Sequence, residues 1–416
     1  MTDAEGKTKK PGKSAVGIFF EEVSRSSLVI PVLAIFSGLL LGGIIVALST
    51  ENVYTLLLTS PLEAISNGFE ASWEAYVTLF TGALGSPSKI IAALQGGDAL
   101  EIRRAFNPFF ESLVRSTPYI FAGLAVSLGF RTGLFNIGVE GQIFMGGIFS
   151  VWVGYSFTGL PAYIHLPFAF IAGALGGALW GFIPGLLKAK TGGHEVINTI
   201  MMNYVAFRLT DWLLREPMKR PGSTNPLSPI IEDSARLPQF FQDPIRFHLG
   251  FFVALATAAL VYWFLFKTKW GFDLRTVGAN PRAARYAGMN IVKSTIVAMS
   301  LSGALAGMAG ANELLGVNHH LSQSFSPGYG FDSIALALLG GNHPVGVVLS
   351  ALLFGTLRNG ATRMQAAAGI PIDIISVMQA LILALIAAPA IVRTIFRLKE
   401  PKKAETGVHV RGWGGS

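Results

Sequence analysis

Long apolar stretches recur along this chain and are separated by polar turns and loops. Each of them can cross roughly 30 Å of hydrocarbon as a helix. They lie near residues 28–50, 112–130, 134–158, 164–187, 195–214, 248–267, 294–317, 344–362 and 371–396. A shorter apolar segment, residues 331–339, ends at a Gly-Gly-Asn-His-Pro turn and counts as a half-helix or a short crossing. The pattern predicts an all-α polytopic membrane protein with about ten transmembrane helices.

The first apolar stretch and the region after it differ from the rest. Residues 28–50 form a long run without charge, which is longer than the apolar core of a secretory signal. We therefore expect a transmembrane helix that is retained in the mature protein. Residues 73–84, WEAYVTLFTGAL, are brief and amphipathic, which is typical of a helix on the membrane surface. We therefore expect residues 51–111 to form an outer extension that includes this surface helix.

Composition supports the membrane assignment. Hydrophobic residues make up 51% of the 416 positions and charged residues only 13%, whereas soluble domains carry nearer a quarter. The chain has no cysteine, which excludes disulfides, thiolate metal sites and cysteine nucleophiles.

The positions of lysine and arginine predict the orientation of the predicted transmembrane domain, residues 28–396. Basic residues gather in the tail 1–27, in the tail 397–416 and in the connection 267–293, whereas the connection 215–247 mixes both signs of charge. We expect the first three on the cytoplasmic side and the fourth outside, which ten crossings satisfy. Cytoplasmic loops on an anionic leaflet then account for the net charge of +8 without a nucleic-acid partner.

Two stretches resemble each other loosely. Residues 180–201 read WGFIPGLLKAKTGGHEVINTIM, and residues 354–378 read FGTLRNGATRMQAAAGIPIDIISVM. In the expected topology the two run in opposite directions through the membrane, as in transporters built from inverted repeats. The alternative is a similarity that arises from shared membrane-helix composition.

The cytoplasmic connection 269–293 contains a short helical signal. An Asn-Pro pair is a plausible helix start and a glycine seven residues after the proline ends the signal. The residues that carry this prediction are Asn280, Pro281, Arg282, Arg285, Tyr286 and Gly288. The connection is either a basic loop that only sets topology or a short helix of the kind that an ABC importer's membrane subunit offers to its ATPase.

Four motifs in the same order resemble the permease subunits of ABC importers for nucleosides, simple sugars and related solutes. They are LFNIGVEGQIFMGG at 134–147, HEVINTIMMNY at 194–204, VGANPRAARYAGMNI at 277–291 and ALLGGNHPVGVVLSALLFGTLRNGA at 337–361. The resemblance covers most of residues 28–396. It points to the branched-chain/ribose-type permease superfamily and to the branch that works with lipoproteins of the basic-membrane-protein type.

The resemblance implies a type II importer subunit in a prokaryotic cell membrane. It would pair with a second permease, unlike or identical, with cytoplasmic ATPase subunits that bind ATP, and with an extracytoplasmic binding lipoprotein. The chain lacks a phosphate-binding loop and a complete His-Glu-x-x-His motif, so we expect no enzyme activity, bound cofactor or metal. Purine nucleosides are the first expected solutes; ribose-like sugars, riboflavin and a stand-alone secondary carrier are the alternatives.

The stretch FNIGVEGQ holds costly polar residues at the start of an apolar stretch: Asn136, Glu140 and Gln142. Asn136 and Glu140 are four residues apart, which would place them on one helix face. That face either lines the translocation route or is packed, with Asn136 capping the helix and Glu140 paired with a neighbouring helix. The predicted topology puts the motif on the cytoplasmic side beside Arg131, which favours a packing or gating role.

Residues in the outer half are the better candidates for solute contact. A polar interruption and the amide- and aromatic-rich segment after it could present groups to a nucleoside or sugar without exposing them to lipid. These candidates are Asn312, Glu313, Asn318, Gln323, Phe325 and Tyr329. The alternative is an outer loop that docks the binding protein. Asn198 and Asn203 are five residues apart, so we expect one to face the route and the other to be packed.

Overall fold

The computed structural model describes residues 29–50, 53, 56, 59–371 and 373–397. Within this part of the chain every regular element is helical, and the extended pairings are the isolated bridges Leu227–Ser322 and Gln239–His248. The predicted all-α class is confirmed. The predicted tails, apart from Arg397, lie outside the described residues.

Each of the ten predicted apolar segments contains a helix. They are α2 (Val29–Ser49), α6 (Ala99–Arg131), α7 (Val139–Ser156), α8 (Ala162–Thr191), α9 (Glu195–Arg215), α10 (Gly250–Lys267), α13 (Ile291–Glu313), α14 (Tyr329–Leu339), α15 (Pro344–Ala368) and α16 (Asp373–Ala387). A last helix, α17 (Pro389–Ile395), follows α16.

By length and apolarity, six helices of the described chain can each cross a membrane: α2, α6, α8, α10, α13 with the π-helical turn after it, and α15. The pair α4 (Pro61–Leu84) and α5 (Pro87–Gly96), bent by 41°, would make a seventh. The number falls below ten because α14 and α16 are short and because α7 and α9 carry polar residues.

Two helices begin well away from the predicted start of their apolar stretch. Helix α6 begins at Ala99, well before residue 112, because Asp98 caps it by accepting a hydrogen bond from the Leu100 amide at 2.9 Å. Helix α7 begins at Val139, because residues 134–138 form a separate loop. The predicted surface helix is the second half of α4, and its side chains Ala75 and Leu79 are buried where α4 packs against α2 and α15.

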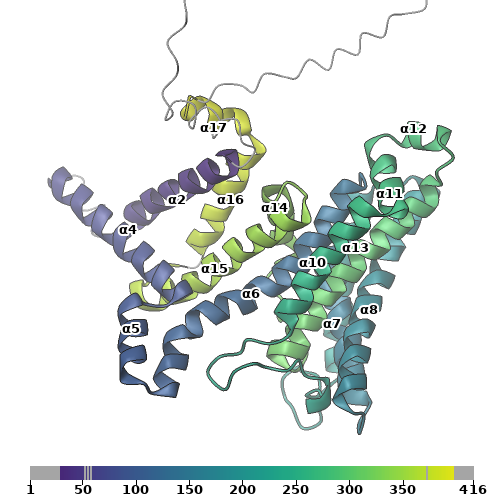
Figure 1. The fold of residues 1–416 in the computed structure, drawn as a ribbon, viewed down its shortest axis with the longest axis horizontal. Coiled ribbons are helices and arrows are strands. Elements are labelled where there is room, and N and C mark those ends of the chain that lie inside the picture. Colours follow the sequence, from purple (N-terminus) through teal and green to yellow (C-terminus); the bar gives the residue numbers. More distant parts are fainter. Residues whose placement is uncertain (1–28, 51–52, 54–55, 57–58, 372, 398–416) are drawn as a thin grey trace, which may run out of the picture.

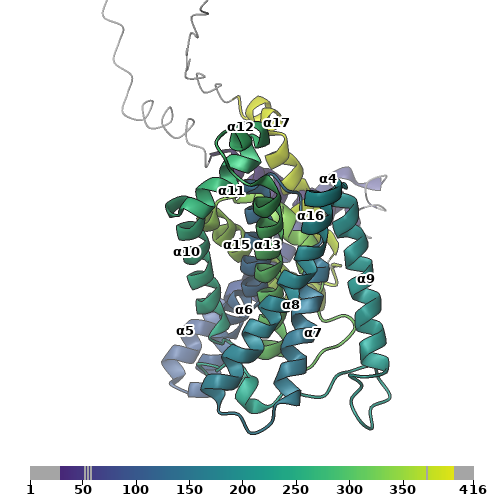
Figure 2. The same cartoon turned by 90° about the vertical axis from the view of Figure 1, so that its right-hand side faces the viewer.

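The helices form two groups that α6 joins (Figure 1). Helices α7, α8, α10 and α13 make one group, and α2, α4, α15 and α16 make the other, with α14 between them. Helix α13 packs against α6, α7 and α8, while α15 packs against α4 and α6. Helix α12 (Pro281–Tyr286) and α17 lie at one end of the body and α5 lies at the other (Figures 1 and 2). We call these the α12 end and the α5 end.

Glycines let α8 and α13 touch backbone to backbone. A Cβ atom on Gly177 would lie 2.2 Å from the Gly303 carbonyl oxygen, and one on Gly307 would lie 2.3 Å from the Gly173 carbonyl oxygen. Close approach through small residues is how membrane helices gain contact area when lipid is as apolar as their side chains. This crossing forms the centre of the largest apolar cluster among the described residues.

The helix contacts support the predicted repeat. In this repeat α6, α7, α8 and α9 would correspond, in that order, to α13, α14, α15 and α16. The packing of α6 against α15 then corresponds to the packing of α13 against α8. Likewise, the packing of α7 against α9 corresponds to the packing of α14 against α16. The starts of α7 and α14 agree as well, since a Phe-x-x-Gly sequence precedes each and its glycine, Gly138 or Gly328, is the N-cap. In each case the residue two before that glycine, Asn136 or Ser326, accepts a hydrogen bond from the glycine amide.

Candidate functional site

The connection between α10 and α13 folds as two helices, α11 (Lys269–Ala279) and α12. The Asn280 side chain caps α12 by accepting hydrogen bonds from the amides of Arg282 and Ala283, both at 3.1 Å. Pro281 occupies the first helical position, where its missing N–H costs nothing. Gly288, with a φ of 78°, ends the turn in the left-handed conformation. The predicted short helix is confirmed.

Helix α12 projects its charged and aromatic side chains outward. Ala284 is its buried contact with the body, whereas Arg282 and Arg285 are exposed and form no ion pair within the described chain. The Tyr286 side chain is 92% exposed. A large aromatic group with so little support from its own chain fits a surface that another protein covers.

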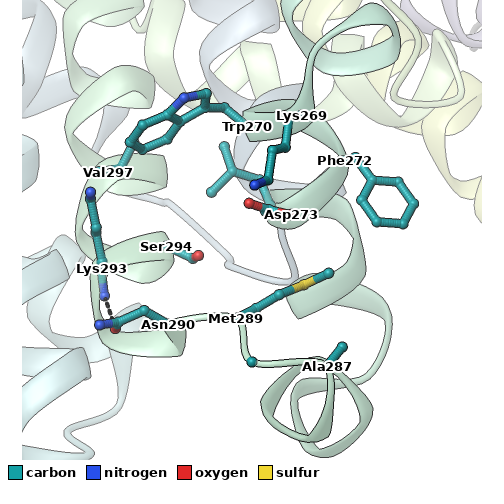
Figure 3. A pocket seen from close by; sticks show the side chains of 12 residues that line it. Lys269, Trp270, Phe272, Asp273, Ala287, Met289, Asn290, Lys293, Ser294 and Val297 are labelled. Atoms are coloured by element: carbon teal, nitrogen blue, oxygen red, sulfur yellow. Dashed lines mark hydrogen bonds between the residues drawn. The ribbon is translucent and has the colours of Figure 1, made fainter.

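A pocket of about 660 Å³ lies beside α12 (Figure 3). Its walls are α11, the link from α12 to α13 and the first turns of α13, and Lys293 Nζ lies 4.6 Å from the centre of the Trp270 ring. The residues lining it are Lys269, Trp270, Phe272, Asp273, Leu274, Ala287, Gly288, Met289, Asn290, Lys293, Ser294 and Val297. The pocket is thus a concave surface next to the exposed helix α12.

Helix α11 connects α12 to the loop before α7. A Cβ atom on Gly133 would lie 2.8 Å from Gly278 Cα, so the two backbones touch. On its other side α11 contacts α10, where a Cβ on Gly271 would lie 2.0 Å from the Phe264 carbonyl oxygen. Backbone contacts of this kind transmit displacement because neither side can yield by changing a rotamer.

Asn136 lies outside α7, so the expectation that it shares a helix face with Glu140 was wrong. Its Oδ1 atom accepts from the Gly138 amide at 3.0 Å, and its Nδ2 atom donates to Gln142 Oε1 and to Ser302 Oγ, each at 2.9 Å. Ser302 in turn donates to the carbonyl oxygen of Ala125 in α6 at 2.7 Å. The amide therefore ties the loop to α6, α7 and α13.

Glu140 lies in the first turn of α7 and is almost fully buried. Its Oε2 atom accepts a hydrogen bond of 2.6 Å from the Gly330 amide, in the first turn of α14. A carboxylate at this place satisfies an unpaired N–H group and complements the positive end of the helix dipole. This geometry fits the packing interpretation and places Glu140 between two helix starts.

Asn203 is packed and Asn198 is not. Asn203 Oδ1 accepts from the Gly141 amide at 2.8 Å, and its Nδ2 atom donates to the Ile137 carbonyl oxygen at 2.9 Å. Asn198 is half-buried near the start of α9. With Asn203, the FNIGVEGQ motif connects the starts of α7 and α14 to the middle of α9 and α13.

The candidates at the end of α13 are buried or half-buried. Asn312 and Glu313 end α13 and are buried, and Asn318 Nδ2 donates to Glu313 Oε1 at 3.4 Å across a π-helical turn (Leu314–Asn318). Gln323 is half-buried in the loop that follows. Phe325 lies 4.7 Å from the Phe144 ring and Tyr329 4.9 Å from the Tyr119 ring. Both are at most 7% exposed, so neither ring offers a free face to a solute in this conformation.

His248 lies just before α10 and stays uncharged at neutral pH. Its Nδ1 atom accepts a hydrogen bond of 3.2 Å from the Gly250 amide. Burial lowers the pKa of His248 to about 4, and the nearby His319 and Arg246 oppose its protonation further. The neutral imidazole therefore satisfies the amide of the first residue of α10.

Sequence reasoning missed a column of polar side chains on α6. Glu111, Arg115 and Tyr119 follow at intervals of four residues and so share one face. Glu111 pairs with Arg246 at 2.5 Å and with Arg115 at 3.4 Å. Tyr119 donates a hydrogen bond of 2.8 Å to Asp332 Oδ2 in α14. The four-residue spacing of these side chains could have revealed the column from the sequence. It was missed because Glu111 lies before residue 112, the expected start of the span, and the other two lie after it.

A pocket of about 210 Å³ opens beside this column at the α5 end. Helices α6 and α15 and the loop before α10 form its walls. The residues lining it are Gly82, Asn107, Pro108, Glu111, Arg115, Pro244, Arg246, Asn359, Thr362 and Arg363. Most of them are charged or polar, which suits the passage of a hydrophilic solute better than contact with lipid.

Asp332 and Arg358 lie deep in the body. Helix α14 ends beside Arg131, whose Nε donates to the Asn342 carbonyl oxygen at 2.8 Å, and its eleven residues span about 16 Å. Its first turn, with Asp332, is therefore about half a bilayer away from the α12 end. A central charge on a lipid-facing helix costs about 2.5–3.5 kcal/mol, so we infer that these half-buried side chains face protein or water.

Comparison with known proteins gives a consistent result. The profile of the family described as branched-chain amino acid transport system permease component matches residues 109–388. The guanosine ABC transporter permease protein NupP of Bacillus subtilis is 45% identical over 303 residues, which cover 71% of this chain and 85% of NupP.

Two further relatives are named for other solutes. The nucleoside ABC transporter permease protein NupB of Lactococcus lactis is 31% identical over 393 residues, 92% of this chain and 97% of NupB. The glucose ABC transporter permease protein TsgB13 of Haloferax volcanii is 38% identical over 285 residues, 66% of this chain and 74% of TsgB13. No solved structure matches the chain.

Proposed function

This chain belongs to the family of branched-chain amino acid transport system permease components, and we propose that it is the permease of an ABC importer for nucleosides, purine nucleosides first. As a member of that family it is a transport subunit and not an enzyme. The observation that carries the nucleoside assignment is the 45% identity to a guanosine permease over 71% of the chain.

The partners follow from this role. A cytoplasmic ATPase would bind ATP and dock on α12, and an extracytoplasmic binding lipoprotein would deliver solute to the loops at the α5 end, residues 215–247 and 318–331. The second permease would be an unlike chain, because α2, α4 and α5 lie outside the part that matches the family. In the cell membrane we place the α12 end and both termini on the cytoplasmic side, as the basic residues indicate.

The contacts support a mechanism of alternating access without chemistry in this chain. Closure of the ATPase would displace α12 and, with it, α11. The backbone contact of Gly278 with Gly133 would pass this displacement to the loop before α7. Glu140 would extend it to α14, whose first turn it holds.

A reconstituted importer provides the test of the proposed function. In vesicles that contain this chain, its second permease, the ATPase and the binding lipoprotein, we expect uptake of labelled guanosine that requires ATP. Excess unlabelled guanosine or inosine should suppress it, whereas ribose, glucose and riboflavin should not. Uptake of glucose or ribose without nucleoside uptake would contradict the assignment, and uptake without ATP would identify a secondary carrier.

The coupling role of α12 predicts a second result. Tyr286→Ala and Arg285→Ala should leave membrane insertion and melting temperature unchanged, because both side chains are exposed. Solute uptake and the ATP hydrolysis that is coupled to it should each fall by about tenfold, as expected when a contact at an interface hot spot is lost. Tyr204→Ala, an exposed tyrosine in α9, is the matched control. Unchanged uptake in Ala284→Pro, which disrupts α12 itself, would refute the coupling role.

A further inference from the structure

Two opposite charges, Asp332 of α14 and Arg358 of α15, lie about half-way through the helical body. Tyr119 connects them: its hydroxyl donates to Asp332 at 2.8 Å, and its ring lies 6.5 Å from the ring of Phe354, one helical turn before Arg358 on α15. Asp332 and Arg358 are both half-buried, so each keeps part of its surface open. A pair of this kind at membrane depth points to a water-filled cavity or a route for polar solutes.

The hydrogen bonds of this pair are incomplete. Asp332 Oδ2 accepts from Tyr119, but its second oxygen has no hydrogen-bond partner in the described part of the chain. Arg358 donates one long hydrogen bond, 3.4 Å, to Ser376 Oγ and has no other among the described residues. The pair therefore offers a free acceptor and several free donors.

The chemistry of the pair selects a solute class. Its net charge is zero, so an anion attracted by Arg358 is repelled by Asp332, and a cation attracted by Asp332 is repelled by Arg358. A neutral solute that carries hydroxyl groups and also carbonyl or ring nitrogen acceptors satisfies both side chains. Phe331, directly before Asp332 and 47% exposed, adds an aromatic ring of the kind on which bases stack.

The 210 Å³ pocket lies one helical turn from the residues around this pair. Arg115 of α6 and Thr362 of α15 both line the pocket. Tyr119 is one helical turn beyond Arg115, and Arg358 is one turn beyond Thr362 in the opposite chain direction. Both helices thus run from the 210 Å³ pocket to the level of the Asp332–Tyr119 hydrogen bond.

We propose that Asp332 and Arg358 form the recognition site for the solute within the membrane, and that Tyr119 positions the carboxylate. Asp332 accepts hydrogen bonds from the ribose hydroxyl groups of a nucleoside, and Arg358 donates to acceptors on the base. The ring of Phe331 lies beside the base. This assignment rests on the proposed function, because it specifies how a nucleoside permease reads its solute.

Selectivity for the ribose tests the assignment. In the complete reconstituted importer, Asp332→Asn should raise the KM for guanosine about tenfold, as expected for a lost hydrogen bond to a charged group. The KM for 2′-deoxyguanosine should change little, so that the preference for guanosine disappears. Tyr119→Phe should reduce the same preference by a smaller factor. Arg358→Lys should raise the KM for both solutes. The binding lipoprotein is the same throughout, so a changed preference belongs to the permease.

Controls separate the outcomes. Asp211→Asn, in α9 and paired with Arg208 at 3.8 Å, should keep both KM values. If the wild-type importer takes up no nucleoside, the proposed function fails whatever the variants do. If it takes up guanosine and Asp332→Asn keeps the wild-type preference, the recognition site is refuted. Should Asp332→Asn fail to accumulate, Tyr119→Phe and Arg358→Lys decide, and an unchanged preference in both refutes it.

Discussion

Gly307→Leu is expected to prevent this chain from accumulating as a folded protein. A Cβ atom at this position would lie 2.3 Å from the Gly173 carbonyl oxygen and 3.0 Å from Gly177 Cα, which belong to the backbone of α8. Separating α8 from α13 would open the largest apolar cluster, so the cost should exceed the usual 1–3 kcal/mol of an overpacked core, to about 4 kcal/mol. The amount of monodisperse protein extracted from membranes and its melting temperature measure the effect.

A glycine without close neighbours provides the control. Gly96 is the last residue of α5, and a Cβ atom there would have no heavy atom within 4 Å. Gly96→Leu should therefore accumulate and melt like the wild type. Gly307→Ala should lie between the two, since a single methyl group meets the same carbonyl. A melting temperature near the wild-type value in Gly307→Leu would contradict the close α8–α13 contact.

Local signals allowed part of this structure to be predicted. Long apolar segments identify membrane helices because the bilayer requires every backbone group to be paired within the helix. Helix α12 was predictable for a similar reason, since Asn280, Pro281 and Gly288 each act on the residues next to them. Neither prediction depends on where the helices lie relative to one another.

Tertiary contacts decided what the sequence could not. The side chain of Asn136 bonds to Gly138 and Ser302, which holds residues 134–138 out of the helix despite their apolar character. Asp332 belongs to an apolar-looking segment, and its depth follows from the length of α14 and the position of Arg131. Phe325 and Tyr329 suited a solute by residue type, but aromatic neighbours from α7 and α6 cover them.

Glu140 illustrates the same distinction between residue type and position. A buried carboxylate in a membrane protein suggests a functional site because it is expensive in lipid. Here its acceptor oxygen serves a particular donor, the Gly330 amide in the first turn of α14. What that turn requires is a hydrogen-bond acceptor, and a negative charge is a smaller additional gain.

Glu140→Ala should therefore abolish uptake, whereas Glu140→Gln should retain most of it. Alanine leaves the buried Gly330 amide unpaired and creates a cavity, at a combined cost of about 3 kcal/mol or more. Glutamine keeps an oxygen that can accept the same hydrogen bond and loses the interaction with the helix dipole, about 1 kcal/mol. Melting temperature and ATP-dependent guanosine uptake measure both variants, and Glu74→Ala at an exposed position in α4 is the control. If a Glu140→Gln protein accumulates and melts normally but has lost uptake, the charge itself takes part in gating. The reason is that glutamine preserves the structure and differs from glutamate in charge.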